Sequence, residues 1–351
     1  MGLVDTLSLS YEELACYTNN FCESNYLGHF QFGKFYRGKI ECAERTQYVL
    51  MKIWEVSKIY IYKRGDNELR LMDEVILPRH ERVTNHPGMA KLYGYCFEGD
   101  HLGVVYDFKP FVSLFNLIPE AGFTWLQRIK VALEFASLLK FLHAVKCSSY
   151  KPFIVRNLDC THLVLDEDYI PKLCDFGLIT GGIFPDRTIY TGHHVLGSYG
   201  YIDCSTIFSG VFSDKQDVYA FGTIFLSLIS KSVYTEEDRQ NSAPCRVVWA
   251  WESFYADDDS ETEVKKPKFS LVHQSLVAES DYDPADGHKI TMLAMECTDN
   301  DVSVRPTMKQ VVRSLLKLKV VKKNADFFGV NKVLRSCENG GFLTNYNSFQ
   351  N

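Results

Sequence analysis

The stretch FIVRNLDCTHLVLDEDYIPKLCDFGL, residues 153–178, contains the pattern that decides the fold. Two short apolar runs at 163–166 and 172–175 each end in an aspartate, and a polar turn separates them. This arrangement predicts two short strands joined by a tight connection. The polar loop before the first strand places Asn157 five residues before His162 and 18 residues before Asp175.

Length and composition are those of an ordinary globular protein. The chain has 351 residues, with 46% hydrophobic and 23% charged, which allows one large domain or two lobes. The net charge is −6 and no long basic tract occurs, so we expect no nucleic-acid binding. The 11 cysteines lack a zinc-binding spacing, and neither a signal peptide nor a membrane-spanning run is present. These features indicate a cytoplasmic chain with reduced thiols.

The N-terminus carries a loose match to an acylation signal. Gly2 after Met1, followed by Thr6, fits the pattern for N-myristoylation. Short motifs of this kind are common by chance, and one myristoyl chain binds a membrane only marginally. Two alternatives therefore stay open: an unmodified cytoplasmic chain, and one that associates with the plasma membrane through acylated Gly2.

The hydrophobic pattern changes near residue 110. Short apolar runs predict strands at 33–38, 48–53 and 103–108, with one helix at 68–81 between them. Beyond Pro110, helices are predicted at 125–143, 217–230, 289–297 and 308–318, with a looser stretch at 234–268. We therefore expect an α+β, bilobal fold with a β-rich N-lobe and a helical C-lobe. The expected divisions are a segment 1–14, lobes at about 15–109 and 110–320, and a tail 321–351.

Residues 27–35, LGHFQFGKF, fit part of a glycine-rich nucleotide loop. In the pattern G-x-G-x-x-G, backbone amides close over nucleotide phosphates. Gly28 and Gly33 occupy the first and third glycine positions, but Phe30 replaces the second. A large side chain there crowds the backbone where a phosphate approaches. Two glycines alone are a weak signal, because a plain hairpin also explains them.

A lysine on the next predicted strand is a candidate phosphate ligand. Lys52 closes the run VLMK, which matches a strand whose lysine holds the α- and β-phosphates of ATP. Its partner should be a carboxylate on the following helix. Glu74 fits this role better than Glu68, which lies at the start of that helix. The alternative is that Lys52 is an ordinary edge charge of a strand.

These motifs and several others together resemble a known family. The chain is similar to plant receptor-like kinases of the Pelle group over about residues 10–320, and in particular to the receptor-like cytoplasmic kinases. The further matching stretches are 10–14, 18–21, 104–108, 197–201, 213–222 and 305–308. The altered loop at 155–162 resembles that of the ZED-related pseudokinases.

The resemblance implies a protein-kinase-like fold and assigns roles to three positions in the catalytic loop. In active kinases an aspartate at position 157 accepts the substrate proton, and an asparagine at position 162 holds a second Mg²⁺. Asn157 cannot act as a base, Asp159 replaces a lysine that faces the γ-phosphate, and the imidazole of His162 is a poor Mg²⁺ ligand. We therefore expect a pseudokinase with no intact catalytic residue, which is not an enzyme. Asp159 as a relocated base is a minor alternative.

The residues for nucleotide binding are better kept than those for catalysis. The expected cofactor-binding residues are Leu27, Gly28, Gly33, Phe35, Lys52, Glu74 and Asp175. Asp175 is also the candidate metal ligand, whereas Phe30 argues against tight phosphate binding. The sequence therefore predicts weak or structural ATP binding and leaves the presence of Mg²⁺ open.

The resemblance also assigns regulatory and scaffold roles. Arg156 corresponds to an arginine that often meets a phosphorylated residue, for which Thr188 and Thr191 are candidates, although local packing of Arg156 is slightly preferred. Asp217 is expected to begin a long helix and to cap the catalytic loop. Arg305 is kept without its usual glutamate partner, so another acceptor or water must serve it. We hypothesise that the activation segment, 175–205, is loosely held until a partner binds.

The function implied by the resemblance is an adaptor role in plant innate immunity. ZED-related proteins link a coiled-coil NLR immune receptor to receptor-like cytoplasmic kinases that bacterial effectors modify. Two alternatives remain for this chain: a weak or atypical serine/threonine protein kinase, and a nucleotide-sensing kinase-like module.

Overall fold

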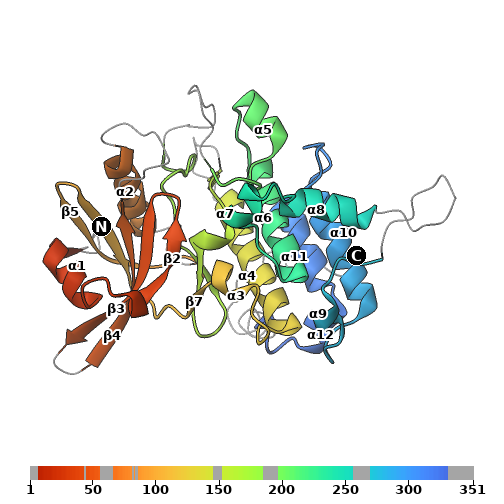
Figure 1. Cartoon of the computed structure of the whole chain (residues 1–351), viewed down its shortest axis with the longest axis horizontal. Helices are drawn as coiled ribbons and strands as arrows, with labels where there is room; N and C mark the ends of the chain where they lie inside the picture. The colour runs from red at the N-terminus through yellow and green to blue at the C-terminus, as the bar shows by residue number, and fades with distance from the viewer. Residues whose placement is uncertain are drawn as a thin grey trace, which may run out of the picture.

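A computed structural model of the chain describes residues 7–42, 45–55, 66–80, 83, 86–144, 152–184, 197–255 and 269–330. A β-rich N-lobe precedes a larger helical C-lobe (Figure 1). The α+β, bilobal fold class expected from the sequence is confirmed. None of the helices in these ranges has the length and apolar content needed to cross a membrane.

The N-lobe is built on a six-stranded sheet with the strand order β1-β5-β6-β4-β3-β2. Its strands are β1 (Leu7–Ser8), β2 (Tyr26–Phe30), β3 (Gly33–Cys42), β4 (Arg45–Trp54), β5 (Leu92–Glu98) and β6 (His101–Tyr106). All neighbouring strands are antiparallel except β1 and β5. Lys52 on the central strand β4 lies opposite Phe35 on β3 and Val104 on β6, so the sheet itself positions the lysine.

Short helices cover this sheet. They are α1 (Tyr11–Tyr17), η1 (Glu23–Asn25), α2 (Asp66–Ile76) and η2 (Leu77–Arg79). The apolar spacing predicted a helix at 68–81, and α2 is that helix, but it ends at Ile76, where a turn of 3₁₀ helix with Pro78 takes over. Leu71 and Val75 are buried, whereas Leu69 and Met72 are exposed.

The C-lobe begins with β7 (Val112–Ser113), α3 (Leu114–Leu117) and α4 (Trp125–Ala144). The predicted strand pair is present as β8 (Leu163–Leu165) and β9 (Pro171–Leu173), which run antiparallel beside β7. The 3₁₀ turn η3 (Cys160–His162) leads directly into β8.

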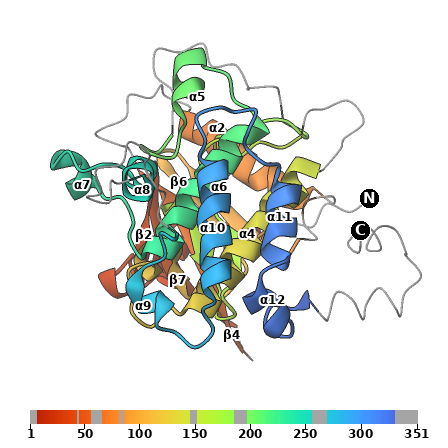
Figure 2. The ribbon, with the colours of Figure 1, turned by 90° about the vertical axis from the view of Figure 1, so that its right-hand side faces the viewer.

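Helices of very different lengths form the body of the C-lobe. They are α5 (Cys204–Ser209), α6 (Asp214–Ser230), α7 (Glu236–Gln240), α8 (Arg246–Phe254), α9 (Gln274–Val277), α10 (Pro284–Cys297), α11 (Met308–Leu316) and α12 (Lys319–Lys323). Figure 2 shows α4, α6, α10 and α11 side by side. Every residue of α6 from Gln216 to Ser230 is buried, so this helix is the axis of the lobe. The looser stretch expected at 234–268 contains α7 and α8, which the sequence analysis missed.

Candidate functional site

The centre of the site is the buried side chain of Lys52. Its Nζ forms one ion pair with Glu74 of α2 and another with Oδ1 of Asp175, 2.6 Å away. Glu74 also accepts hydrogen bonds from the hydroxyl of Tyr106 and from the backbone N–H of Phe176, 2.6 Å away. The pairing of Lys52 with Glu74 was predicted from the sequence, whereas the contact with Tyr106 was not. The signal for Tyr106 was a tyrosine at the end of an apolar strand, since a buried hydroxyl needs a partner.

The two carboxylates of this cluster share one lysine, and their pKa values move apart. Burial raises the pKa of Glu74 to about 7 although Lys52 opposes the rise, and the nearby charge of Asp175 adds to it. Burial also opposes the ionisation of Asp175, but Lys52 and then His162 lower its pKa to about 2. Burial raises the pKa of Tyr106 well above its usual range, so its hydroxyl remains a hydrogen-bond donor. Opposite shifts of the two pKa values are the outcome expected for closely spaced acids that share one cation.

The aromatic ring of Phe30 closes this cluster from the glycine-rich turn. The Nζ of Lys52 lies 4.3 Å from the ring centroid of Phe30 and 4.6 Å from that of Trp54. Phe30 itself is buried and packs at 5.1 Å, centroid to centroid, against Phe35. Two carboxylates and two rings therefore surround Nζ, and a phosphate reaches it only if Phe30 moves aside.

The remaining predicted residues of the glycine-rich turn lie on β2 and β3, close to Phe30. A Cβ at position 33 would lie 1.9 Å from the carbonyl oxygen of Ile53, so Gly33 permits the close pairing of β3 with β4. Gly28 faces Ser113, whose Oγ would lie 3.5 Å from a Cβ at position 28. Leu27 is buried and its carbonyl accepts a hydrogen bond from Asn116. The structure therefore places Leu27, Gly28, Gly33 and Phe35 around the turn, and their role in binding a cofactor stays a prediction.

The three altered positions of the catalytic loop each make a structural contact. The Nδ2 of Asn157 donates to Oδ2 of Asp175 at 3.0 Å. Asp159 accepts from the backbone N–H of Thr161 at 2.7 Å and from the hydroxyl of Ser198. The Nδ1 of His162 lies 2.6 Å from the carbonyl oxygen of Asn157. Since Asp159 caps the turn η3 and ties down Ser198, a role as a relocated base has no support from its contacts.

The scaffold under the loop has the contacts that the sequence predicted. Asp217 accepts hydrogen bonds from the backbone N–H groups of Val155 and Arg156, both at 2.9 Å. It lies one turn inside α6, which begins at Asp214 because Ser213 caps it, so the expectation that Asp217 begins the helix is wrong. The guanidinium of Arg156 lies 4.1 Å from the ring centroid of Phe212, in accord with the packing alternative. Thr188 and Thr191, the candidate phosphorylation sites, lie outside the described residues, as does Gly2.

The acceptor for Arg305 is Asp203. The two side chains form a buried ion pair, and the Nε of Arg305 also donates to the carbonyl of Asp299 at 2.7 Å. Burial disfavours the charge on Asp203, but Arg305 outweighs it and lowers the pKa of the carboxyl. Asp203 also caps α5 by accepting from the N–H of Thr206. An aspartate has therefore taken over the position of the expected glutamate, and it holds the end of the activation segment.

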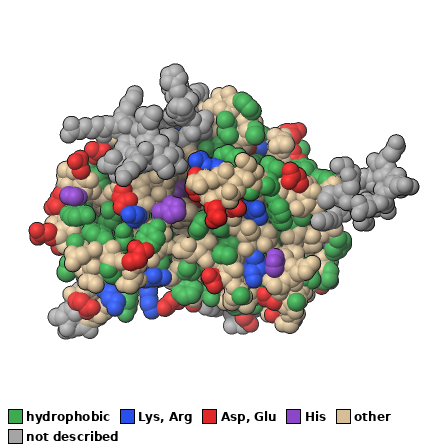
Figure 3. Space-filling view, viewed as in Figure 1, with side chains coloured by type: hydrophobic (Ala, Val, Ile, Leu, Met, Phe, Trp, Pro, Cys, Tyr) green, Lys and Arg blue, Asp and Glu red, His purple; other side chains and the backbone are tan. Residues whose placement is uncertain are grey.

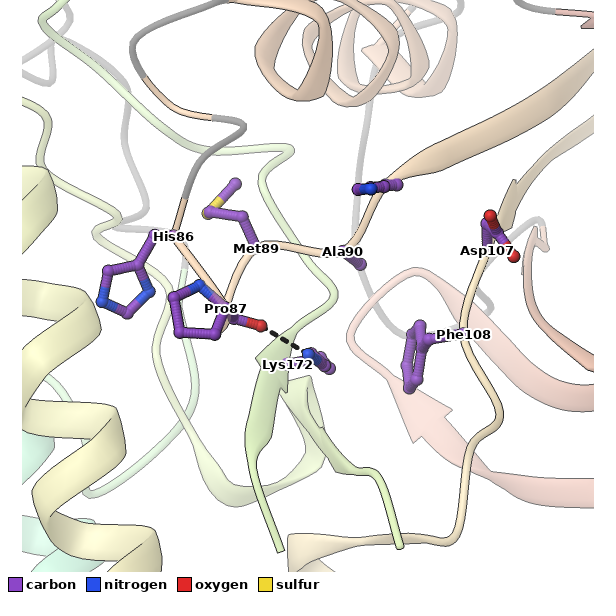
Figure 4. A pocket seen from close by; sticks show the side chains of 8 residues that line it. His86, Pro87, Met89, Ala90, Asp107, Phe108 and Lys172 are labelled. Atoms are coloured by element: carbon purple, nitrogen blue, oxygen red, sulfur yellow. Dashed lines mark hydrogen bonds between the residues drawn. The ribbon is translucent and has the colours of Figure 1, made fainter. Parts of the chain in front are cut away.

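A separate hollow of about 460 Å³ lies beside the segment that joins the lobes (Figure 4). Its lining residues are His86, Pro87, Met89, Ala90, Lys91, Asp107, Phe108 and Lys172. Lys172 donates to the carbonyl of Pro87 across it, and burial lowers the pKa of His86 to about 4. None of Lys52, Glu74 and Asp175 lines this hollow, so it is distinct from the site around Lys52.

Comparison with known proteins identifies the family. The profile of the protein tyrosine and serine/threonine kinase family matches residues 22–315, which include Lys52, Glu74, the catalytic loop and Asp175. The chain belongs to this family. Kinase domains bind ATP together with Mg²⁺.

Several curated plant kinases are similar to this chain. The probable serine/threonine-protein kinase PBL7 of Arabidopsis thaliana is 28% identical over 313 residues, which cover 88% of this chain and 76% of that protein. The probable serine/threonine-protein kinase PBL16 of the same plant is 29% identical, covering 91% and 75%. The EPD1-interacting receptor-like cytoplasmic serine/threonine-protein kinase of Nicotiana benthamiana is 30% identical, covering 87% and 62%. The chain is therefore homologous to receptor-like cytoplasmic kinases.

These comparisons overturn the prediction that the chain is not an enzyme. The relatives are named as serine/threonine-protein kinases, and the kinase profile runs through the altered loop without a break. The prediction judged the chain by Asn157, Asp159 and His162 alone. It gave too little weight to the assembled cluster of Lys52, Glu74 and Asp175, which the structure holds in place.

The donor atoms of the site fit one metal ion better than two. Asp175 offers the carboxylate that kinases use for Mg²⁺, whereas His162 puts a nitrogen where an oxygen ligand is usual. Within the described residues, no group of three or more His, Cys, Asp and Glu side chains is arranged to hold a metal ion. A metal ion at Asp175 therefore needs further ligands from a bound nucleotide.

Proposed function

We propose that the chain is an atypical serine/threonine protein kinase of the receptor-like cytoplasmic type, with slow phosphoryl transfer. The observation that carries the proposal is the pairing of Lys52 with both Glu74 and Asp175. Protein kinases need the lysine–glutamate ion pair and the metal-binding aspartate in place before they transfer phosphate. Family membership over residues 22–315 supports the same conclusion.

The slow rate follows from the catalytic loop and from Phe30. An amide at Asn157 holds a substrate hydroxyl by a hydrogen bond but takes no proton, and a positioned general base is typically worth ~10²–10⁴-fold in rate. The carboxylate of Asp159 replaces a cation beside the phosphates and lowers the rate further. Phe30 shields Lys52, so we expect ATP to bind weakly.

Transfer of a radiolabelled γ-phosphate from ATP to a generic serine/threonine substrate tests the proposal. We expect slow labelling that depends on Lys52, so that Lys52→Met removes it. The triple variant Asn157→Asp, Asp159→Lys, His162→Asn restores the family pattern and should raise the rate by about 10²-fold or more, since it returns the base. Labelling by the wild type that is equal to that by Lys52→Met would refute kinase activity.

A second proposed role is that of an adaptor in plant innate immunity. Phe208, near the end of α5, is 89% exposed, and α5 projects from the C-lobe (Figure 1). Beside it lies a cavity of about 790 Å³ between α5 and α8, lined in part by Tyr199, Ile207 and Trp251. Exposed apolar side chains next to an apolar hollow are typical of a protein-binding surface. On the face shown in Figure 3, hydrophobic side chains lie among interspersed acidic and basic ones.

The partners proposed for this role are a coiled-coil NLR immune receptor and receptor-like cytoplasmic kinases. The proposal rests on the resemblance to ZED-related proteins together with the exposed Phe208. A pull-down from plant tissue with Phe208→Ser as bait should recover less of both partners than the wild type. Phe97→Ser, which changes an exposed phenylalanine on β5 of the N-lobe, is the matched control. Equal recovery by all three baits would exclude α5 as the contact.

Membrane association through acylation of Gly2 remains a proposal of the same kind. It predicts that Gly2→Ala leaves the fold unchanged and moves the protein from the membrane fraction to the soluble fraction.

A further inference from the structure

A buried histidine faces two carboxylates at the nucleotide site. His162 is fully buried, and its Nδ1 lies 2.6 Å from the carbonyl oxygen of Asn157. Because a carbonyl oxygen only accepts, Nδ1 carries the hydrogen, so Nε2 of the neutral ring presents a lone pair. Among the described residues Nε2 has no hydrogen-bond partner, and it lies 3.4 Å from Oδ2 of Asp175 and 3.8 Å from Oδ2 of Asp159.

Electron-rich atoms of His162 and Asp175 converge here, and a cation between these two side chains would satisfy both. Donors about 2.1 Å from one metal ion lie about 3.0–3.4 Å apart at octahedral to tetrahedral angles. The 3.4 Å between Nε2 of His162 and Oδ2 of Asp175 falls within that range. Asp159 is farther away and already accepts from Ser198, so it adds negative charge rather than a ligand.

The chemistry of this pair of donors selects the class of metal ion. Mg²⁺ prefers oxygen ligands and keeps its water, whereas imidazole together with carboxylate suits divalent first-row transition metals. The carbonyl of Asn157 fixes the ring of His162 in the orientation that aims Nε2 at Asp175. Holding the second nitrogen of a ligating histidine is how proteins commonly orient such ligands.

We propose that Nε2 of His162 and Oδ2 of Asp175 hold a divalent transition metal ion in the nucleotide complex, so that the site favours Mn²⁺ over Mg²⁺. The inference rests on the proposed kinase function, because phosphate oxygens of ATP supply the remaining ligands. Oδ2 of Asp175 accepts one hydrogen bond, from Asn157, and keeps a second lone pair for the metal. The histidine therefore changes the metal preference of the site rather than only removing a ligand.

Pulsed electron paramagnetic resonance of Mn²⁺ tests the ligand directly. Mn²⁺ is the probe because, unlike Zn²⁺, it has little affinity for thiols such as the exposed Cys16 and Cys204. The protein is prepared with ¹⁵N-labelled histidine and mixed with Mn²⁺ and ATP. We expect nitrogen modulation that changes between labelled and unlabelled protein. His162→Asn should lose this change, whereas His86→Asn, at the separate hollow, should keep it.

Titration of ATP in the presence of each metal gives the second measurement. Loss of a residue that only hydrogen-bonds to a metal ligand typically costs 10–100-fold in metal affinity. A direct ligand such as His162, which suits Mn²⁺ but not Mg²⁺, should contribute at least as much. We therefore expect ATP to bind at least about tenfold more tightly with Mn²⁺ than with Mg²⁺. His162→Asn should remove that preference. The titrations are repeated on Phe30→Gly, so that shielding of Lys52 does not hide nucleotide binding.

The outcomes separate the metal inference from the kinase proposal. If ATP binds equally well with both metals, or if histidine labelling leaves the spectrum unchanged, the metal inference is wrong and kinase function stands. If neither the wild type nor Phe30→Gly binds ATP with either metal, both the metal inference and the kinase proposal are wrong.

Discussion

Replacing Phe30 with glycine should open the site around Lys52 to nucleotide phosphates. The variant restores the second glycine of the loop pattern and removes the ring that lies 4.3 Å from Nζ of Lys52. To bind the wild type, ATP must displace this ring from its packing against Phe35 and Trp54. The free energy of that displacement is subtracted from the affinity for ATP, so its removal should tighten binding.

Two contributions set the size of the effect. Exposing a buried phenylalanine costs about 1.5–3 kcal/mol, and losing a desolvated ring–ammonium contact costs about 0.5–2 kcal/mol. Their sum is roughly 2–5 kcal/mol, and each 1.4 kcal/mol is a factor of ten. The lower end corresponds to about 30-fold tighter binding of ATP, and we take it as the expected gain because a displaced ring keeps some packing.

Isothermal titration with ATP measures this gain. Deleting a buried phenylalanine typically costs ~3–5 kcal/mol of stability, so unfolding in urea is first used to choose a temperature at which the variant is folded. Phe32→Leu is the matched control, since Phe32 is equally buried in the same turn but its ring faces the guanidinium of Arg70, at 3.8 Å. If folded Phe30→Gly binds ATP no more tightly than Phe32→Leu, the ring of Phe30 does not limit access to Lys52.

Two further predictions concern buried charges. Asp203→Asn should lower the free energy of unfolding in urea by ~3–5 kcal/mol, because it leaves the buried Arg305 without its counter-charge. Asp283→Asn should have a much smaller effect, because solvent screens its pair with Lys319. A loss below about 1 kcal/mol for Asp203→Asn would mean that other acceptors suffice. Stability of the wild type should fall as the pH rises from about 4.5 to about 7, because Glu74 ionises at lower pH in the unfolded chain than in the folded one. Glu74→Gln should remove this fall, so that the urea midpoint of unfolding changes less between pH 4.5 and pH 7. An unchanged dependence of the midpoint on pH would contradict the raised pKa of Glu74.

Much of the fold was predictable because its signals are local and periodic. The apolar spacing along 125–143 identified α4, where Ile129, Ala132, Leu139 and other stripe residues are all buried. The interval from Asn157 to Asp175 identified the β8–β9 pair. The helices α7 and α8 were missed because they are short: α7 has no buried residue, and α8 buries only one face.

The site was predictable in its residues but not in its contacts. Lys52, Glu74 and Asp175 follow from spacing, whereas the position of the Phe30 ring depends on side-chain packing across β2, β3 and β4. Spacing also left open which residue meets Arg305, because Asp203 and Arg305 are distant in the sequence and only the fold brings them together. The prediction that the chain is no enzyme failed for a related reason. It rested on three substitutions in the catalytic loop, although the residues around Lys52 are kept.

The contacts of the catalytic loop imply that its three substitutions depend on one another. Asn157 donates to Asp175 at 3.0 Å, so Asn157→Asp alone would place two carboxylates at that distance. Like charges this close raise one pKa and destabilise the loop. In the usual kinase loop, nearby cations, the lysine at position 159 and the bound metal ions, balance these carboxylates. Single reversion at Asn157 should therefore restore less activity than the triple variant, and the combined effect should exceed the sum of the single ones. Equal rates for the single and triple variants would show that the loop positions act independently.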